Sequence, residues 1–204
     1  ASGKVQPYWV DLFVPSSCPA GEHLLPFTIN SDQGSATVTA RLTVWAFELP
    51  QKPALQTAFA YWPPVRGQLQ PELLLLENRI QPTFTDATHS AALDAAGQAA
   101  VHVGFWASLN SSNCTIANAK PTTTDVNAAV ARYAPLEPYA YIADEVYTSC
   151  DSSTPLYNWT EALRDRVKTM VTIAPRSGWE WLDIFVTLPK FDVAADVAAA
   201  QARG

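Results

Sequence analysis

The amino-acid sequence predicts an α/β protein with a β-rich N-terminal portion. Residues 36–47 alternate apolar and polar side chains with period two, which is typical of a strand. After Pro50, apolar runs of strand type alternate with helical segments, which is the pattern of a parallel sheet with helical crossovers. With 204 residues, of which 48% are hydrophobic and 16% charged, the chain can bury a core and form one domain or a tight pair.

Three strands are expected before Pro50. The segments are 8–14, which ends at Pro15, 23–29, and 36–47. Residues 30–35 contain Asn, Asp and Gly and predict a turn between the second and third strands. Three strands are too few for a closed sandwich of about seven strands, and they leave open edges.

The remainder of the chain predicts six strands that alternate with helices. Strands are expected near residues 58, 83, 103, 141, 170 and 184, of which the third runs over 101–106 and the sixth over 181–186. Helices are expected over 71–79, 90–100, 124–132, 158–165 and 194–202. The pattern fits a doubly wound sheet or three quarters of a barrel, which usually needs about 250 residues. The final helix predicts the approach to a further strand. No Gly-rich fingerprint follows the first strand, so we expect no dinucleotide cofactor.

The charge and motif content excludes several function classes. The 13 basic and 19 acidic residues give a net charge of −6, which argues against a nucleic-acid-binding surface. No apolar run is long enough to span a membrane. The three histidines, His23, His89 and His102, do not have a metal-ligand spacing, and no P-loop or nucleophile elbow occurs. We therefore expect no metal, no membrane span and no nucleic-acid partner.

Three glycosylation sequons predict an extracellular or secreted protein. They begin at Asn110, Asn113 and Asn158, within about fifty residues. The three cysteines, 18, 114 and 150, do not match a zinc template. Outside the cell, an odd number leaves a free thiol, an intermolecular bond or a partner elsewhere. The alternative is that all three are buried, reduced thiols.

The segment with the clearest chemical content is an apolar strand, 139–143, that runs directly into Asp144 and Glu145. Functional groups gather at the carboxyl ends of strands in parallel α/β folds. Adjacent carboxylates repel each other, which favours one protonated and one ionised member, as glycoside hydrolysis requires. The alternative is that both residues begin a loop and cap the next helix.

At this segment the chain resembles glycoside-hydrolase-like proteins related to family 123, the β-N-acetylgalactosaminidases. The resemblance covers most of the chain and rests on the order and spacing of several segments: 42–50, 54–59, 75–82, 141–145, 167–170 and 183–186. It implies a partial β-sandwich over 1–50, followed over 54–204 by an incomplete (β/α)8 TIM-type barrel that stops after about six strands.

The resemblance also implies a mechanism and a set of site residues. In such enzymes the N-acetyl group of the substrate attacks the anomeric carbon, so hydrolysis is substrate-assisted and retaining. Glu145 would be the general acid and then the base, and Asp144 would orient the acetamido nitrogen. The residues expected to line the sugar site are Tyr141, Trp106, His102, Trp62 and Arg79. The alternatives are barrel packing for the two tryptophans, a core position for His102 and an ion pair for Arg79.

The chain departs from this family in two ways: it has two long loops that each carry a cysteine, and its sheets lack strands. The resemblance places two long loops after the third and fourth strands, and these loops carry Cys114 and Cys150. We expect the two cysteines to form a disulfide, which a Cα separation beyond about 7 Å would exclude. The sandwich and the barrel each lack strands. We therefore expect further sequence of the same polypeptide, or neighbouring chains, to cover the open edges.

Two functions remain open on the sequence. The first is a glycoside hydrolase that acts on N-acetylhexosamine glycans, which the carboxylate pair favours. The second is a non-catalytic extracellular glycoprotein module, carbohydrate-binding, structural or filament-forming, that keeps the hydrolase fold. The sequons, the missing strands and Cys18 favour the second.

Overall fold

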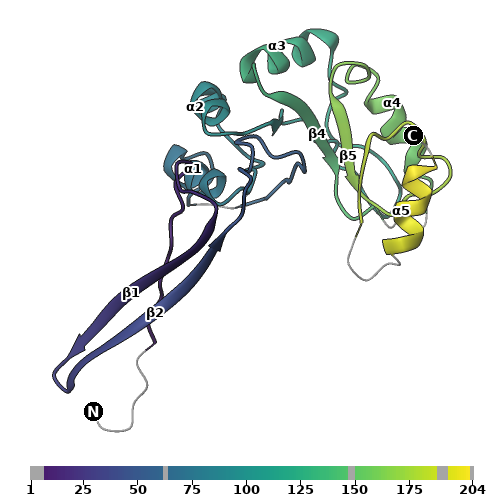
Figure 1. Ribbon diagram of the computed structural model, residues 1–204. Helices are drawn as coiled ribbons and strands as arrows, with labels where there is room; N and C mark the ends of the chain where they lie inside the picture. Colours follow the sequence, from purple (N-terminus) through teal and green to yellow (C-terminus); the bar gives the residue numbers. More distant parts are fainter. Residues whose placement is uncertain (1–6, 62–63, 147–149, 188–192, 203–204) are drawn as a thin grey trace. The chain divides into compact units, whose positions relative to one another are not determined.

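The chain has a mixed α/β structure, seen in a computed structural model that describes residues 7–61, 64–146, 150–187 and 193–202 (Figure 1). It divides into two compact units, Ala1–Pro50 and Gln51–Gly204. The first contains a two-stranded antiparallel sheet and the second a four-stranded parallel sheet. The α/β class expected from the sequence is therefore confirmed.

The N-terminal unit is built on one long hairpin. Strand β1, Gly21–Ser31, pairs with β2, Gly34–Val44, in a register that runs from Gly21 opposite Val44 to Ser31 opposite Gly34. Gly34 closes the turn with a positive φ of 120°, which a glycine adopts without strain. Because paired residues share a face, Leu25, Phe27 and Ile29 lie with the small and apolar residues of β2 on one side of the hairpin.

The strand expected over residues 8–14 is wrong, because the structure assigns this segment no secondary structure. Its apolar residues are not buried either: Trp9 is 89% exposed and Phe13 is 90% exposed. The local sequence has strand character, but a strand also requires a neighbouring strand to pair with its backbone. Among the described residues, the antiparallel sheet contains β1 and β2 only.

The C-terminal unit alternates helices with strands. Before the first strand of its sheet come α1 (Leu69–Glu77), the short 3-10 helix η1 (Ala87–His89) and α2 (Ser90–Ala95). The sheet and its remaining helices then follow in chain order as β3 (Ala100–His102), α3 (Thr123–Tyr133), β4 (Glu137–Ala143), α4 (Ser153–Trp159), β5 (Lys168–Thr172), β6 (Ile184–Val186) and α5 (Val193–Gln201).

The strands of this unit are parallel and adjacent in chain order, β3-β4-β5-β6. The two earlier strands expected near residues 58 and 83 meet at one parallel bridge, between Phe59 and Pro82. Consecutive parallel strands with right-handed crossovers bring successive helices to the same face of a sheet. Helix α3 begins with a capping box, in which Thr122 and Asp125 satisfy each other's backbone N–H groups.

Alternate strand residues point to two faces of the parallel sheet, one of which is packed against helices. Ala140 and Ile142 of β4 and Val171 of β5 are fully buried in one hydrophobic cluster. That cluster also contains Val126 of α3 and Leu156 of α4, so these helices cover this face of the sheet. The residues between them in the strands, such as Tyr141, point to the opposite face.

Several element boundaries differ from those expected. The strand expected to reach Trp106 ends at His102, and Gly104 follows with a positive φ of 86°. The helix expected over 158–165 is displaced, because α4 ends at Trp159. The strand expected from residue 181 begins at Ile184, which follows Asp183, whose carboxylate accepts bonds from Thr169.

Candidate functional site

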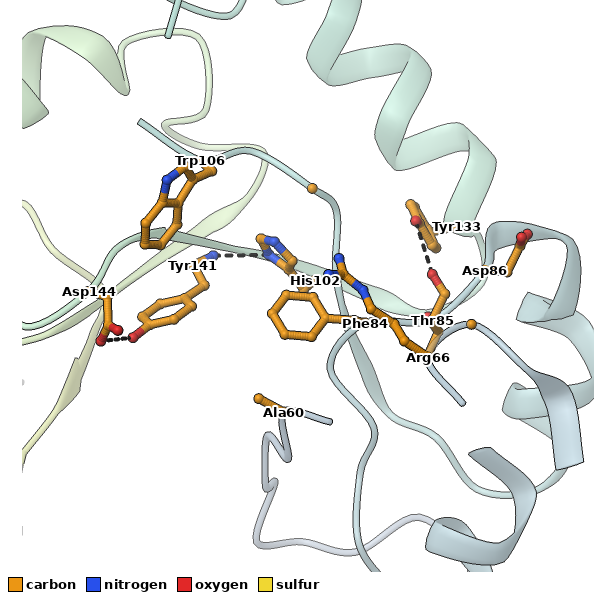
Figure 2. A pocket seen from close by; sticks show the side chains of 12 residues that line it. Ala60, Arg66, Phe84, Thr85, Asp86, His102, Trp106, Tyr133, Tyr141 and Asp144 are labelled. Atoms are coloured by element: carbon orange, nitrogen blue, oxygen red, sulfur yellow. Dashed lines mark hydrogen bonds between the residues drawn. The ribbon is translucent and has the colours of Figure 1, made fainter. Parts of the chain in front are cut away.

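A cavity of about 700 Å³ lies at the face of the parallel sheet opposite α3 and α4, in the C-terminal unit (Figure 2). Four residues expected from the sequence line it: His102, Trp106, Tyr141 and Asp144. The others that line it are Ala60, Arg66, Gly67, Phe84, Thr85, Asp86, Gly104 and Tyr133. The cavity therefore combines aromatic rings with acidic, basic and imidazole groups.

The sheet brings the central residues together by register. His102 ends β3, and its partner in β4 is Tyr139, so both rings lie on one face with centroids 5.9 Å apart. Tyr141 is two residues further along β4 and therefore shares that face. The ring of Trp106 packs edge-on against Tyr141, with 5.7 Å between centroids. His102, Tyr141 and Trp106 together form an aromatic wall of the cavity (Figure 2).

Asp144 is held by the hydroxyl of Tyr141, which donates to its Oδ1 atom (Figure 2). The same hydroxyl oxygen lies 2.5 Å from Oγ1 of Thr172, the last residue of β5. Burial, followed by the hydrogen bond to Asp144, raises the pKa of Tyr141 well above its ordinary value of 10. Tyr141 is thus neutral, and its hydroxyl orients the carboxylate that lines the cavity.

Glu145 lies directly after Asp144 at the carboxyl end of β4, and its side chain is exposed. Its φ is +43°, a left-handed conformation that a residue with a Cβ atom adopts only at a cost. The next residue, Val146, is buried, and its N–H donates to the carbonyl oxygen of Thr172 at 3.1 Å. Glu145 is therefore next to the cavity, on a backbone turn fixed on both sides.

His102 is buried in the cavity wall, and burial lowers its pKa from 6.5 to about 4. Its Nδ1 atom accepts a hydrogen bond from the backbone N–H of Tyr141 at 3.1 Å (Figure 2). A neutral imidazole that accepts at Nδ1 carries its proton on Nε2. His102 is therefore uncharged at neutral pH and is a hydrogen-bond donor through Nε2.

The cavity also holds one guanidinium and a second carboxylate. The Arg66 guanidinium carbon lies 4.2 Å from the ring centroid of Phe84, a cation–π arrangement. Asp86 caps η1: its Oδ1 accepts from the Thr88 N–H at 2.8 Å and from the Thr88 hydroxyl at 2.7 Å. These two bonds, the backbone one first, lower the pKa of Asp86. Asp86 therefore has a structural role beside any contact with a ligand.

One residue expected in the sugar site, Arg79, lies elsewhere in the C-terminal unit. Arg79 does not line the cavity; it follows α1 with a φ of +61°, and its Nη1 atom donates to the carbonyl oxygen of Gln51 at 3.2 Å. Trp62 lies outside the described residues. Of the site residues expected from the sequence, the structure thus gathers His102, Trp106, Tyr141 and Asp144 around one cavity, and Glu145 follows Asp144 in the chain.

The expected disulfide between Cys114 and Cys150 is confirmed, with a Cα–Cα distance of 6.0 Å. It joins the loop that follows β3 to the loop that follows β4, and those loops also carry Trp106 and Asp144. The remaining cysteine, Cys18, is a free thiol in the N-terminal unit. The disulfide therefore restrains the two segments that follow the central strands of the site.

The three sequon asparagines are exposed. Asn110 and Asn113 lie in the loop after β3, where each side-chain oxygen accepts from a backbone N–H two residues on, of Ser112 and Thr115 respectively. Asn158 lies in α4. Exposure makes all three accessible to modification, and glycosylation itself stays a prediction.

Eight of the lining residues were not identified from the sequence, among them Arg66, Phe84, Asp86 and Tyr133. Asp86 follows the segment 82–84 much as Asp144 follows β4, so the rule that polar groups gather after strands would have found it. Tyr133 is the last residue of α3, and its hydroxyl donates to the carbonyl oxygen of Thr85 at 3.4 Å. Its contribution depends on tertiary packing and has no sequence signal.

Comparisons with known proteins do not assign the chain to a family. No family model matches it, and no curated protein sequence matches it significantly. Within the described ranges, no helix is both long and apolar enough to cross a membrane. In the same part of the chain, no three His, Cys, Asp or Glu side chains are grouped so that they could hold a metal ion.

Proposed function

We propose that the C-terminal unit is a glycoside hydrolase that acts on N-acetylhexosamine glycans by substrate-assisted, retaining hydrolysis. The observation that carries the proposal is the position of the two adjacent carboxylates. Asp144 lines an aromatic cavity at the carboxyl end of β4, and Glu145 follows it on a left-handed backbone turn. Strained residues at the end of a parallel strand are a feature of functional sites.

The chemistry assigns a different role to each carboxylate. Asp144, oriented by the Tyr141 hydroxyl, accepts a hydrogen bond from the N–H of the substrate's acetamido group. The carbonyl oxygen of the same acetamido group attacks the anomeric carbon. Glu145 donates a proton to the leaving oxygen and then takes one from the incoming water. The oxazolinium forms with one inversion at the anomeric carbon, and water opens it with a second inversion, so the released sugar has the β configuration. Trp106 and Tyr141 offer ring surface to the apolar face of the sugar.

The fold that accompanies this proposal is an open part of a (β/α)8 barrel preceded by part of a β-sandwich. Its support is topological. The four parallel strands follow one another in chain order without the reversal of a doubly wound sheet, and α3 and α4 cover the same face. The opposite face, which is the interior of a barrel, carries His102 and Tyr141 of the cavity.

We also propose that the protein acts outside the cell. The disulfide between Cys114 and Cys150 is typical of oxidising compartments. The three exposed sequons, which begin at Asn110, Asn113 and Asn158, support the same location. Mass spectrometry of the secreted protein before and after removal of N-glycans tests this proposal, which predicts a mass decrease and a deamidated asparagine at one or more sequons.

The test of the hydrolase proposal is turnover of an aryl 2-acetamido-2-deoxy-β-D-galactopyranoside. Wild-type protein should release the aryl alcohol, and Glu145→Gln and Asp144→Asn should each lower kcat/KM by at least about a hundredfold. Glu161→Gln is the matched control, because Glu161 is an exposed carboxylate in a surface ion pair with Lys120. An aryl galactoside with a 2-hydroxyl should not react. Equal rates for both aryl substrates, or an active Glu145→Gln variant, would contradict the proposal.

A second candidate function is glycan binding without catalysis, in a structural or carbohydrate-binding glycoprotein module. The observation that favours it is that Glu145 is exposed and does not line the cavity, whereas Asp144 does. Trp106 is 39% exposed and leaves ring surface for a sugar. Binding of N-acetylgalactosamine that is lost in Trp106→Ala, in a protein with no turnover, would favour this candidate over the hydrolase.

A further inference from the structure

We infer that Thr172 is a positioning residue for the carboxylate segment Asp144–Glu145, acting through the Tyr141 hydroxyl and through its own backbone. The inference rests on the proposed function for its catalytic meaning. Thr172 is the last residue of β5, only 5% exposed, and it is not one of the residues that line the cavity. Its effect on any substrate is therefore exerted through its neighbours.

The direction of the hydrogen bonds follows from counting protons. The Tyr141 hydroxyl donates its single proton to Oδ1 of Asp144. The Thr172 hydroxyl, 2.5 Å from the Tyr141 oxygen, must therefore be the donor in the second bond. The result is a chain from Thr172 to Tyr141 to Asp144. Each donor in such a chain polarises the next hydroxyl, which strengthens the bond that reaches the carboxylate.

Thr172 also holds the other end of the same segment. Its carbonyl oxygen accepts the N–H of buried Val146 at 3.1 Å. The two contacts flank Glu145, which has the left-handed φ of +43°. A backbone conformation of this kind persists only where its surroundings fix it. One residue at the end of β5 therefore restrains the segment on both sides of the proposed acid–base residue.

The side-chain contact and the backbone contact can be separated by substitution. Thr172→Val keeps the shape, the strand preference and the carbonyl oxygen but removes the hydroxyl. Thr172→Ser restores the hydroxyl. Thr169→Val is a matched control, because Thr169 is a buried residue of the same strand whose hydroxyl donates to Asp183 at 2.9 Å, away from Asp144.

The first measurement is kinetic, with the aryl 2-acetamido-2-deoxygalactoside and full-length protein. Loss of one neutral hydrogen bond predicts that Thr172→Val lowers kcat by about three- to tenfold with a smaller change in KM. Thr172→Ser should recover most of the loss, and Thr169→Val should keep the wild-type kcat. A kcat for Thr172→Val equal to that of the wild type, or a loss of the same size in Thr169→Val, would overturn the inference.

The second measurement does not need activity. In protein labelled with 13C at aspartate side-chain carbonyl carbons, Thr172→Val should shift the Asp144 resonance, Thr172→Ser should return it, and Thr169→Val should leave it in place. If no variant or wild type hydrolyses the substrate but the resonance responds in this way, the proposed function fails and the positioning role stands. An Asp144 resonance that is unaffected by Thr172→Val overturns the positioning role whether or not the protein is active.

Discussion

Replacement of His102 by Asn tests the buried neutral imidazole in the cavity wall. The folded protein lowers the pKa of His102 from 6.5 to about 4, with burial as the main cause. Between these values the unfolded chain binds a proton that the folded chain does not. The contribution that neutral His102 makes to the free energy of unfolding is therefore fully present above about pH 6.5, and it is lost as the pH falls toward 4. Asn keeps an acceptor near the position of Nδ1, so the bond from the Tyr141 N–H can persist without a titrating group.

The size of the effect follows from the difference between the two pKa values. A difference of about 2.5 pH units, at about 1.4 kcal/mol for each unit, gives about 3 kcal/mol. The assay is urea unfolding, followed by far-ultraviolet circular dichroism, at half-unit steps between pH 4 and pH 7.5. Between pH 7.5 and pH 4 the free energy of unfolding of the wild type should fall by about 3 kcal/mol more than that of His102→Asn, because all other titrating groups are common to both proteins. A difference between the two proteins that stays constant with pH, within about 1 kcal/mol, would refute this reasoning.

Three further substitutions test the packing around the site. Removal of the disulfide in Cys114→Ser with Cys150→Ser, which opens a loop with a sequence separation of 36, should lower the free energy of unfolding by about 3 to 4 kcal/mol; a loss below about 1 kcal/mol would contradict the restraint. Tyr61→Phe removes the 2.8 Å bond to the fully buried carboxylate of Glu72 and should cost about 1 to 3 kcal/mol in the same unfolding assay; an unchanged value would mean that water replaces the hydroxyl. Leu163→Ala, at a fully buried core position, should cost about 3 kcal/mol, and a cost below about 1 kcal/mol would contradict close packing there.

Local patterns in the sequence identify the main strands and helices because each has a strong periodic signal. The alternation over residues 36–47 corresponds to β2, and the apolar run at 139–143 corresponds to β4. Segment 8–14 has the same local character but forms no strand, because pairing depends on a neighbour that local sequence does not specify. The expected β-sandwich and barrel also concern long-range arrangement, so they remain proposals.

The residues of the candidate site also fall into two groups, those that local sequence identifies and those that depend on contacts between distant segments. Residues at the carboxyl ends of strands, such as Asp144 and Trp106, could be named from the sequence because the rule for parallel sheets is positional. Arg79 follows a helix, and its side chain bonds to the carbonyl oxygen of Gln51 instead of lining the cavity, a contact that its position in the sequence does not indicate. Thr172 has no signal in the sequence: its importance depends on the register of β4 and β5, which brings its hydroxyl to Tyr141.

The configuration of the first sugar released is the most direct test of the central claim. Proton NMR recorded during the first minutes of hydrolysis of the aryl 2-acetamido-2-deoxy-β-galactoside distinguishes the two anomers before they equilibrate. Substrate-assisted hydrolysis by Asp144 and Glu145 predicts that the β-hemiacetal appears first, and that Glu145→Gln abolishes its formation. The α-hemiacetal as the first product, or no hydrolysis by the wild-type protein, would contradict the account.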